Sequence, residues 1–378
     1  MHLIRILFLL SFFTSGLALA ATERPVLPLG APLPDFKLPA VDGRDCTPAD
    51  FATAKVFVIV FTSNHCPTAQ AYEERLKKLV TEYQPRGVAL LAINPNHAEA
   101  VRLDEMGYTD LGDTFAEMKI RAAHSAFNFP YADDGPTQAV AEKFGAVATP
   151  HVFIFDQSRH LRFQGRIDDS EREDLVKHRD TRDAIEALLA GREPAVTSTK
   201  VFGCSLKWRE KADDNRRWRE KVAKEPVALT PADAVTLKEL RANAGTGKLR
   251  LINVWATWCG PCVSEFDELI EHNLRFRHRD FELVTLAAQF PDEEAKVRKF
   301  LQQHQASTRN LIFGSTDKYA LMEALDPEWK GALPHTLLIG ADGKVLYRET
   351  GSIDFLSLRR AIVPALNALT PWPGLSPK

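Results

Sequence analysis

The sequence lacks an excess of charge of either sign. Its 48 lysines and arginines nearly balance 50 aspartates and glutamates, which leaves a formal charge of −2. Proteins that bind nucleic acid or anionic membranes carry clustered basic charge, so this balance argues against both partners. Glycine is sparse too, at 20 of 378 residues, which excludes collagen-like and linker-type chains. The 45% hydrophobic content is that of a folded protein, and the length favours two domains.

Long apolar runs are absent except at the amino terminus. Residues 6–19 are mostly apolar and follow the basic Arg5, and Ala18-Leu19-Ala20 places small residues where a signal peptidase cuts, before Ala21. The run is shorter than the ~20 residues of a spanning helix, and no cysteine follows the cut to carry a lipid. We therefore predict a signal peptide at residues 1–20 and an exported, periplasmic protein without a membrane anchor after cleavage.

Cysteine is also scarce. Disulfide-stapled secreted domains carry a dense and even set of cysteines, whereas this chain has five. Few cysteines in an exported protein, two of them in Cys-x-x-Cys, point to redox chemistry instead. Cys46, near the start of the first domain, is expected to be a small buried apolar residue.

The sequence does contain the same order of strand, helix and cysteine signals twice. Two short, β-branched apolar runs, residues 55–62 and 249–256, have the pattern of buried parallel strands. Each run turns into a helical pattern with a cysteine at the junction. Further on, each half has a Pro-His pair before a strand, a turn, a second strand and a Gly-x-Ile-Asp end. Alternating strands and helices predict parallel βαβ units, closed by an antiparallel edge. The individual predictions are helices over 68–83 and ending near 274, and strands over 152–155 and 336–339.

A charged segment separates the two halves. The stretch from Gly191 to Asp233 holds three prolines, and residues 209–225 are rich in charges of both signs. The segment at residues 209–229, between domains at 28–208 and 230–370, could be a solvated helix or a loose tether, and we favour a helix packed on one domain.

The Cys259-Gly-Pro-Cys262 motif is the strongest chemical signal. The thiolate is the reactive form of cysteine, and the free N–H groups at a helix N-terminus lower the pKa of a thiol placed there. A second cysteine three residues on can reach the first sulfur and release a mixed disulfide. A zinc site would need a second Cys/His pair, and none stands at suitable spacing in this half.

Residues 253–265, with Leu333-Pro334-His335 downstream, resemble the TlpA/ResA-type thioredoxin family over about residues 226–370. The resemblance implies a thioredoxin fold in which Cys259 attacks a substrate disulfide and Cys262 resolves the intermediate. It implies a cis proline at Pro334 that helps dock the substrate backbone. Where thioredoxins in general have a buried Asp, this chain has Asn253.

Two neighbours of the motif are assigned by position. The family branch carries a glutamate three residues after the second cysteine, and Glu265 matches it. Glu265 lies one helical turn from Cys262 and could take or give the proton of that thiol. The alternative is that Glu265 is a solvent-facing helix residue. Trp258 directly precedes Cys259 and is expected to border the substrate groove, while Trp255 is expected in the core.

The first half resembles the AhpC/TSA-like redoxins, in the peroxiredoxin-like branch with an Asn-His-Cys-Pro motif. The matching segments are residues 30–36, 41–43, 64–67, 149–150 and 202–208. The resemblance implies a thioredoxin-like fold with Cys66 at the active position and a cis Pro150, which is expected at the substrate groove. The chain departs from true peroxiredoxins at Ile59, where they have proline. Ala69 replaces the second cysteine of a Cys-x-x-Cys motif.

The role of Cys66 therefore has several readings. It could be a reactive thiolate stabilised by His65, or a relic thiol in a domain kept for docking. Cys204 could resolve its intermediates or form a permanent bridge with it. Cys66, His65 and His151 could also bind copper together.

The fold class predicted is α/β: two thioredoxin-like folds in tandem, each a central mixed sheet flanked by helices. The function predicted is an exported thiol–disulfide oxidoreductase, a reductant that uses Cys259 and Cys262 and could relay electrons to Cys66. It requires no cofactor, acts on protein thiols and disulfides, and by family analogy is recharged by a DsbD-type membrane thiol reductase. The alternatives are a thiol peroxidase centred on Cys66 with Cys204 resolving, and a non-enzymatic copper-binding or docking module.

Overall fold

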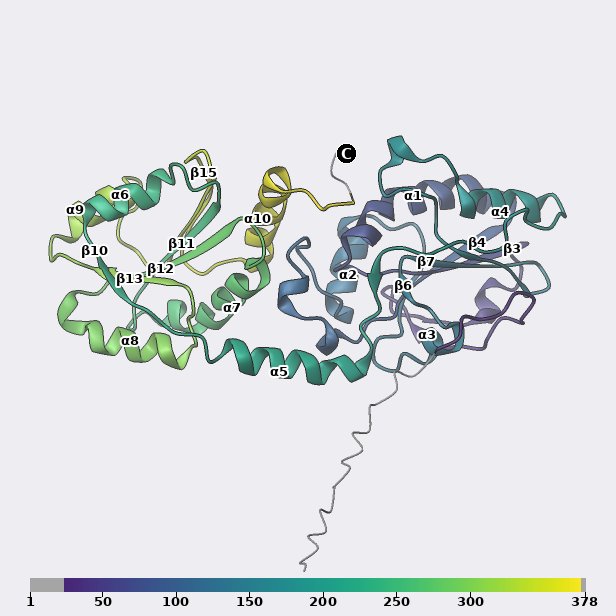
Figure 1. Cartoon of the computed structure of the whole chain (residues 1–378), viewed down its shortest axis with the longest axis horizontal. Coiled ribbons are helices and arrows are strands. Elements are labelled where there is room, and N and C mark those ends of the chain that lie inside the picture. Colours follow the sequence, from purple (N-terminus) through teal and green to yellow (C-terminus); the bar gives the residue numbers. More distant parts are fainter. Residues whose placement is uncertain (1–23, 375–378) are drawn as a thin grey trace, which may run out of the picture.

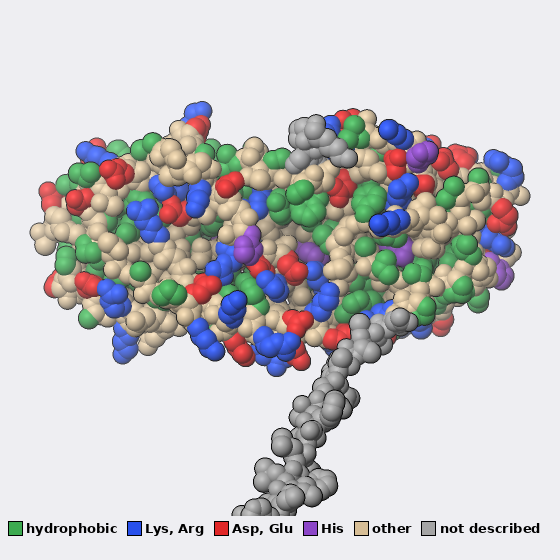
Figure 2. All heavy atoms as spheres, in the orientation of Figure 1, with side chains coloured by type: hydrophobic (Ala, Val, Ile, Leu, Met, Phe, Trp, Pro, Cys, Tyr) green, Lys and Arg blue, Asp and Glu red, His purple; other side chains and the backbone are tan. Residues whose placement is uncertain are grey.

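The computed structural model describes residues 24–374, so the predicted signal peptide lies outside the described residues. Two sheets, each packed with helices, lie side by side and are joined along one edge by helix α5 (Figure 1). Within residues 24–374, no helix is long and apolar enough to cross a membrane. On the face drawn in Figure 2, acidic and basic side chains are interspersed, in keeping with the near-zero net charge.

The first sheet has five strands in the order β5-β4-β3-β7-β8. Strands β3, β4 and β5 are parallel to one another, and β7 pairs antiparallel with both of its neighbours, β3 and β8. The strands are β3 (Val56–Phe61), β4 (Val88–Asn94), β5 (Tyr131–Asp133), β7 (His151–Phe155) and β8 (Leu161–Gly165). Two small sheets pair β1 (Leu38–Pro39) with β2 (Asp45–Cys46), and β6 (Ala148–Thr149) with β9 (Cys204–Ser205). The helices are α1 (Pro67–Tyr83), α2 (Phe115–His124), α3 (Ala139–Phe144) and α4 (Asp180–Leu189).

The second sheet repeats this order and adds one edge strand, giving β10-β13-β12-β11-β14-β15. Its first four strands are parallel to one another, and β14 pairs antiparallel with both of its neighbours, β11 and β15. The strands are β10 (Thr230–Ala232), β11 (Leu249–Trp255), β12 (Phe281–Ala287), β13 (Arg309–Phe313), β14 (His335–Ile339) and β15 (Val345–Thr350). The helices are α6 (Ala234–Ala242), α7 (Gly260–Phe276), α8 (Glu294–Gln303), α9 (Lys318–Leu325) and α10 (Phe355–Leu369).

The central strand of each sheet explains why the fold has helices on both faces. All six residues of β3 are buried. Because successive side chains of a strand point to opposite faces, both faces of the sheet must be covered here. Val56, Val58 and Val60 join one core cluster, and the alternating phenylalanine and isoleucine side chains join another. Helices α1 and α4 contribute to the first cluster and α3 to the second. The predicted α/β fold, with two thioredoxin-like units in tandem, is confirmed.

Helix α5 (Ala212–Val222) forms in the charged segment, as predicted, but it contacts both halves of the molecule. Trp218 and Val222 pack in a small apolar cluster between Leu103 of the first half and Leu274 of the second. The expectation that this helix packs on one domain is therefore wrong. Val222 is buried and Trp218 half-buried in this cluster, while most charged side chains of the helix are exposed.

The two halves also touch directly through the carboxyl end of α7. Arg275 is 6% exposed and donates hydrogen bonds to the carbonyl oxygens of Met106, at 3.2 Å, and Thr109, at 3.0 Å. Arg279 donates to the Gly107 carbonyl oxygen at 2.7 Å. Backbone carbonyls are thus the partners of these guanidinium groups, and their buried hydrogen bonds fix the docked arrangement.

Candidate functional site

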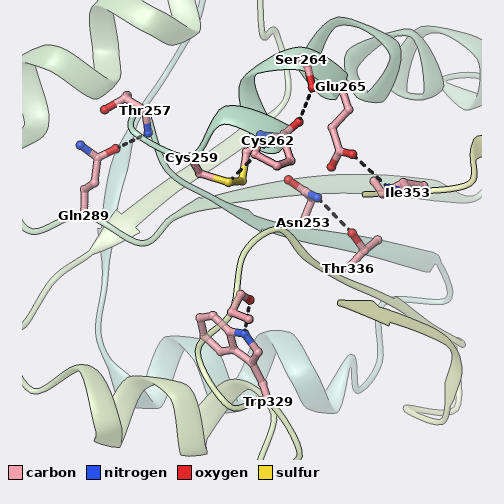
Figure 3. The surroundings of a disulfide bond; sticks show 12 residues. Asn253, Thr257, Cys259, Cys262, Ser264, Glu265, Gln289, Trp329, Thr336 and Ile353 are labelled. Atoms are coloured by element: carbon pink, nitrogen blue, oxygen red, sulfur yellow. Dashed lines mark hydrogen bonds between the residues drawn. A yellow bond between two sulfur atoms is a disulfide. The ribbon is translucent and has the colours of Figure 1, made fainter. Parts of the chain in front are cut away.

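The dithiol of the second half lies where β11 ends and α7 begins. Cys259 is the N-cap residue of α7, and its sulfur accepts a hydrogen bond from the Cys262 backbone N–H at 3.3 Å. Pro261, in the first turn, suits a helix start because its missing N–H would have no partner there. Cys259 and Cys262 form a disulfide (Figure 3). The strand-to-helix junction therefore presents both sulfurs at a helix N-terminus, the position that favours a thiolate.

The residues around this disulfide differ sharply in exposure. Trp258 is 63% exposed and Trp255 is fully buried, where its ring packs on Phe266 at 4.6 Å. The peptide bond before Pro334 is cis. The indole next to Cys259 is thus exposed to solvent, and its place at a substrate groove stays a prediction.

Glu265 is buried in α7, so the possibility that it faces solvent is wrong. It is 9% exposed, and one carboxylate oxygen accepts the Ile353 backbone N–H at 3.0 Å (Figure 3). The other oxygen is buried without a hydrogen-bond partner among the described residues. Burial raises the pKa of Glu265 above its usual value. A carboxyl with a free oxygen and a raised pKa has the properties of a proton-exchanging group.

Asn253 lies on β11 and is buried under the dithiol (Figure 3). Its side-chain amide donates to the Thr336 hydroxyl at 3.0 Å. This pair is neutral, so Asn253 supplies no carboxyl to this site.

Cys66 occupies the matching place in the first half, as the N-cap residue of α1. Its side chain is fully buried, accepts the Ala69 backbone N–H at 3.4 Å and lies 3.1 Å from the Thr149 carbonyl oxygen. Burial alone would raise the pKa of Cys66. The Cys204 thiol, the charge of His65 and the Ala69 N–H outweigh burial and lower this pKa to about 6.

A buried ion pair adjoins Cys66. His65 Nδ1 and Asp113 Oδ2 are 2.6 Å apart, and both side chains are at most 2% exposed. Asp113 also accepts from the backbone N–H groups of Asn64 and His65, and from the Asn96 amide. Although burial opposes the charge, Asp113 raises the pKa of His65. His65 Nε2 is buried and has no hydrogen-bond partner in residues 24–374. The sequence analysis missed Asp113 and Asn96, because no local motif links them to a cysteine so far away.

Cys204 is brought to Cys66 by the two-stranded sheet of β6 and β9. Cys204 lies opposite Thr149 in this antiparallel pair. Gly203 permits the approach: its φ is +137°, and a Cβ there would lie 2.2 Å from the Thr149 carbonyl oxygen. Both thiols are free, and the neighbouring Cys66 together with burial raises the pKa of Cys204. Pro150, which follows Thr149, is cis.

His151, the third residue considered for copper binding, contacts another side chain. His151 Nε2 lies 3.0 Å from the Gln164 side-chain oxygen, and burial lowers the pKa of this imidazole to about 4. Among the residues that the structure describes, no cluster of three or more His, Cys, Asp or Glu side chains is arranged to hold a metal ion. The copper hypothesis thus gains no support. Cys46 is 8% exposed and unpaired, as a small core residue would be.

Comparisons with known proteins find a separate family match for each half of the chain. The AhpC/TSA family matches residues 29–164, and the Redoxin family matches residues 225–361. The crystal structure of a hypothetical protein from Sinorhizobium meliloti 1021 is 32% identical and covers 49% of this chain and 96% of its own, with a TM-score of 0.43.

Two curated relatives carry names that describe a reaction. The chain is 32% identical to the thiol:disulfide interchange protein CycY of Rhizobium leguminosarum bv. viciae, over 38% of this chain and 69% of the relative. It is 29% identical to the thiol-disulfide oxidoreductase ResA of Bacillus subtilis (strain 168), over 31% of this chain and 60% of the relative. The chain belongs to this family of thioredoxin-like thiol–disulfide oxidoreductases and carries two redoxin-type domains in tandem.

Proposed function

We propose that this protein is an exported reductant of protein disulfides that works through Cys259 and Cys262. One observation carries the proposal: the dithiol lies at the N-terminus of α7 directly beside the exposed Trp258. A protein substrate can contact the exposed Trp258 beside the dithiol, and the helix N-terminus stabilises the attacking thiolate.

The proposed cycle uses two successive thiol exchanges. The Cys259 thiolate attacks one sulfur of the substrate disulfide, and the other substrate sulfur leaves as a thiolate. Glu265 takes the proton of Cys262, whose thiolate then attacks the Cys259 sulfur and releases the second substrate thiolate. Trp258 and Pro334 border the groove that holds the substrate chain. The resulting Cys259–Cys262 disulfide is returned to the dithiol by an upstream reductant, which we propose to be a membrane thiol reductase.

The reaction is tested by reduction of insulin disulfides with dithiothreitol as the electron source. Cys259→Ser should reduce the rate to background, because the attacking sulfur is gone, whereas the matched control Cys66→Ser should retain it. Activity that survives Cys259→Ser would refute the proposal. A reductant of low potential should also be a disulfide in glutathione buffers and become a dithiol only in the more reducing dithiothreitol buffers.

Export is supported by the amino-terminal sequence pattern and is tested separately. After expression of the full-length chain in a bacterium, the protein should be recovered from the periplasm with Ala21 as its first residue by intact mass. Recovery in the cytoplasm with residues 1–20 attached would contradict export.

We further propose that the dithiol relays electrons to the first domain, but not across the docked arrangement. Arg275, which contacts the first domain, lies 16 residues from Cys259 on α7. At a rise of about 1.5 Å per residue, this places the dithiol about 24 Å along the helix from that contact. The relay therefore requires the domains to separate, or a second copy of the chain.

The relay is tested by following reduction of the first domain after dithiothreitol is added to oxidised protein. Cys259→Ser should slow that reduction, and an unchanged rate would end the relay hypothesis. Transfer between copies should accelerate with protein concentration, whereas transfer after domain separation should not.

A thiol peroxidase is the second candidate, favoured by the lowered pKa of Cys66, about 6, and by the free Cys204 thiol beside it. Such an enzyme would consume hydrogen peroxide and lose this activity in Cys66→Ser. Against it stand the complete burial of Cys66 and the Ile59 that replaces the expected proline. A Cys66→Ser variant that consumes peroxide as fast as the parent would remove this candidate.

A further inference from the structure

The two domains differ in what lies against the residues before their cis prolines. In the first domain, Ala148 and Thr149 pair with the chain's own strand β9, which carries Cys204. In the second domain, Ala332 and Leu333 pair with no strand among residues 24–374. Strand β9 thus covers the residues before Pro150, whereas no strand among the described residues pairs with those before Pro334.

This covering strand decides which sulfur of the first domain is accessible. Cys66 has no exposed surface, whereas Cys204 is partly exposed. Gly203 lets β9 lie against the Thr149 carbonyl, which is itself 3.1 Å from the Cys66 sulfur. An incoming thiol that approaches this domain therefore meets Cys204 first.

The surroundings of the two sulfurs suit them to different steps. Cys66 has the α1 N-terminus and the buried His65–Asp113 pair beside it, and both stabilise a negative charge on sulfur. Cys204 lies on a strand without such support. In thiol–disulfide exchange, the sulfur that holds its charge more readily leaves faster.

We propose that Cys66 and Cys204 form a second dithiol–disulfide couple in which Cys204 receives the attack and Cys66 is the leaving thiolate. This reverses the roles expected from sequence, where Cys66 held the active position and Cys204 resolved. In the step, an external thiolate forms a bond to the Cys204 sulfur, and the Cys66–Cys204 bond breaks with its electron pair on Cys66. A second thiol of the reductant then attacks its own partner sulfur, loses its proton to solvent, and releases Cys204, which takes up a proton. Two electrons pass to the couple, and the reductant becomes a disulfide.

The roles of the two sulfurs stand independently of the second domain. Only the identity of the physiological reductant, the Cys259/Cys262 dithiol, rests on the proposed function. The test therefore uses the full mature chain with Cys259→Ser and Cys262→Ser together, which leaves the first domain as the source of dithiol chemistry. Insulin reduction by the unaltered chain tests the proposed function separately.

The experiment begins by oxidising this double variant with diamide and confirming a Cys66–Cys204 disulfide by non-reducing peptide mass spectrometry. Reduced glutathione is then added, the reaction is quenched with acid at short times, and free thiols are alkylated. We expect glutathione on Cys204 and the alkyl group on Cys66, with at least about tenfold less of the opposite product. The same protocol on the unaltered chain guards against a folding defect in the variant, and Cys46→Ser is the matched control that should change nothing.

Each other result overturns the proposal. Glutathione found mainly on Cys66 would restore the roles expected from sequence. No Cys66–Cys204 disulfide after diamide would show that the two thiols are not a redox couple. A disulfide that forms but takes up no glutathione at either sulfur would show that Cys204 is not an entry point.

Discussion

The two cysteine sites are built from the same parts and differ in where the second thiol comes from. Each places a cysteine at the N-cap of a helix, after a buried central strand and near a cis proline. In the second domain the partner, Cys262, lies in the first turn of the same helix, and no strand among the described residues pairs with Ala332 and Leu333. In the first domain the partner, Cys204, comes from a distant strand that pairs with Ala148 and Thr149. The position of the second thiol in the sequence thus decides whether a strand of the chain lies against the residues before the cis proline.

The groups that handle charge also differ between the sites. The second domain has Glu265, a buried carboxyl whose pKa is raised by burial, beside a disulfide. The first has a buried His65–Asp113 ion pair beside a free thiol. A carboxyl with a raised pKa can exchange a proton, whereas a charged imidazole stabilises a thiolate by its charge, without proton transfer. The comparison predicts proton-limited exchange at one site and charge-stabilised sulfur at the other.

The largest effect expected from this difference is at Glu265. Glu265→Gln should slow the resolving step at Cys262 by about 10²-fold, because the amide cannot accept the thiol proton. The loss should shrink as pH rises and the Cys262 thiol ionises unaided, which a stopped-flow pH profile of insulin reduction would show. The matched control is Asp267→Asn, whose side chain is 79% exposed on the same helix. Equal losses in both variants, or an unchanged pH profile, would assign Glu265 a structural role.

Arg275→Ala tests whether docking matters to one site more than to the other. Removing the guanidinium leaves the carbonyls of Met106 and Thr109 without its hydrogen bonds, which should lower the unfolding free energy by about 2 kcal/mol. Thermal unfolding measures the loss, and small-angle X-ray scattering should report separated domains. Insulin reduction at Cys259 should persist. The control Arg298→Ala removes an exposed ion pair with Glu294 and should change stability by less than about 0.5 kcal/mol. Unchanged scattering in Arg275→Ala would show that other contacts hold the domains.

Asp113→Asn tests the charge stabilisation at Cys66. Without the carboxylate, His65 loses the partner that raises its pKa and becomes neutral near pH 7, so the pKa of Cys66 should rise from about 6 by about one unit. The sign is fixed: thiolate absorbance should disappear at a higher pH in the variant as the solution is acidified. The titration is made with Cys259 and Cys262 as serines, and Asp156→Asn, at an acid paired with Arg162, is the control. An unchanged midpoint would mean that His65 does not act on Cys66.

The smallest effect is expected at Trp258. Trp258→Ala should cost about 1 kcal/mol of substrate contact, which corresponds to about a fivefold rise in KM for insulin. The rate at saturation and the unfolding temperature should remain, because the indole is 63% exposed. Tyr319→Ala, at a 72% exposed ring elsewhere in the domain, should leave KM unchanged. A fall in the saturated rate without a change in KM would place Trp258 outside the groove.

The regular elements could be predicted because their signals are local. The run of apolar residues predicted a strand over 55–62, and β3 spans Val56–Phe61. The helix predicted from 68 to 83 is α1, Pro67–Tyr83, whose start is marked by a cysteine cap and a proline in the first turn. The two-residue strands β6 and β9 gave no such signal. Two residues are too few for any periodicity, and their pairing joins segments more than fifty residues apart.

Sequence by itself determined the α/β architecture, the duplication and the dithiol, because burial periodicity and the Cys-Gly-Pro-Cys spacing are written in consecutive residues. Tertiary structure decided the rest. It placed Asp113 against His65, brought Cys204 close to Cys66 through the pairing of β6 with β9, and packed α5 against both domains. These contacts join residues far apart along the chain, and their free energies depend on burial and hydrogen bonds that exist only after the chain has folded.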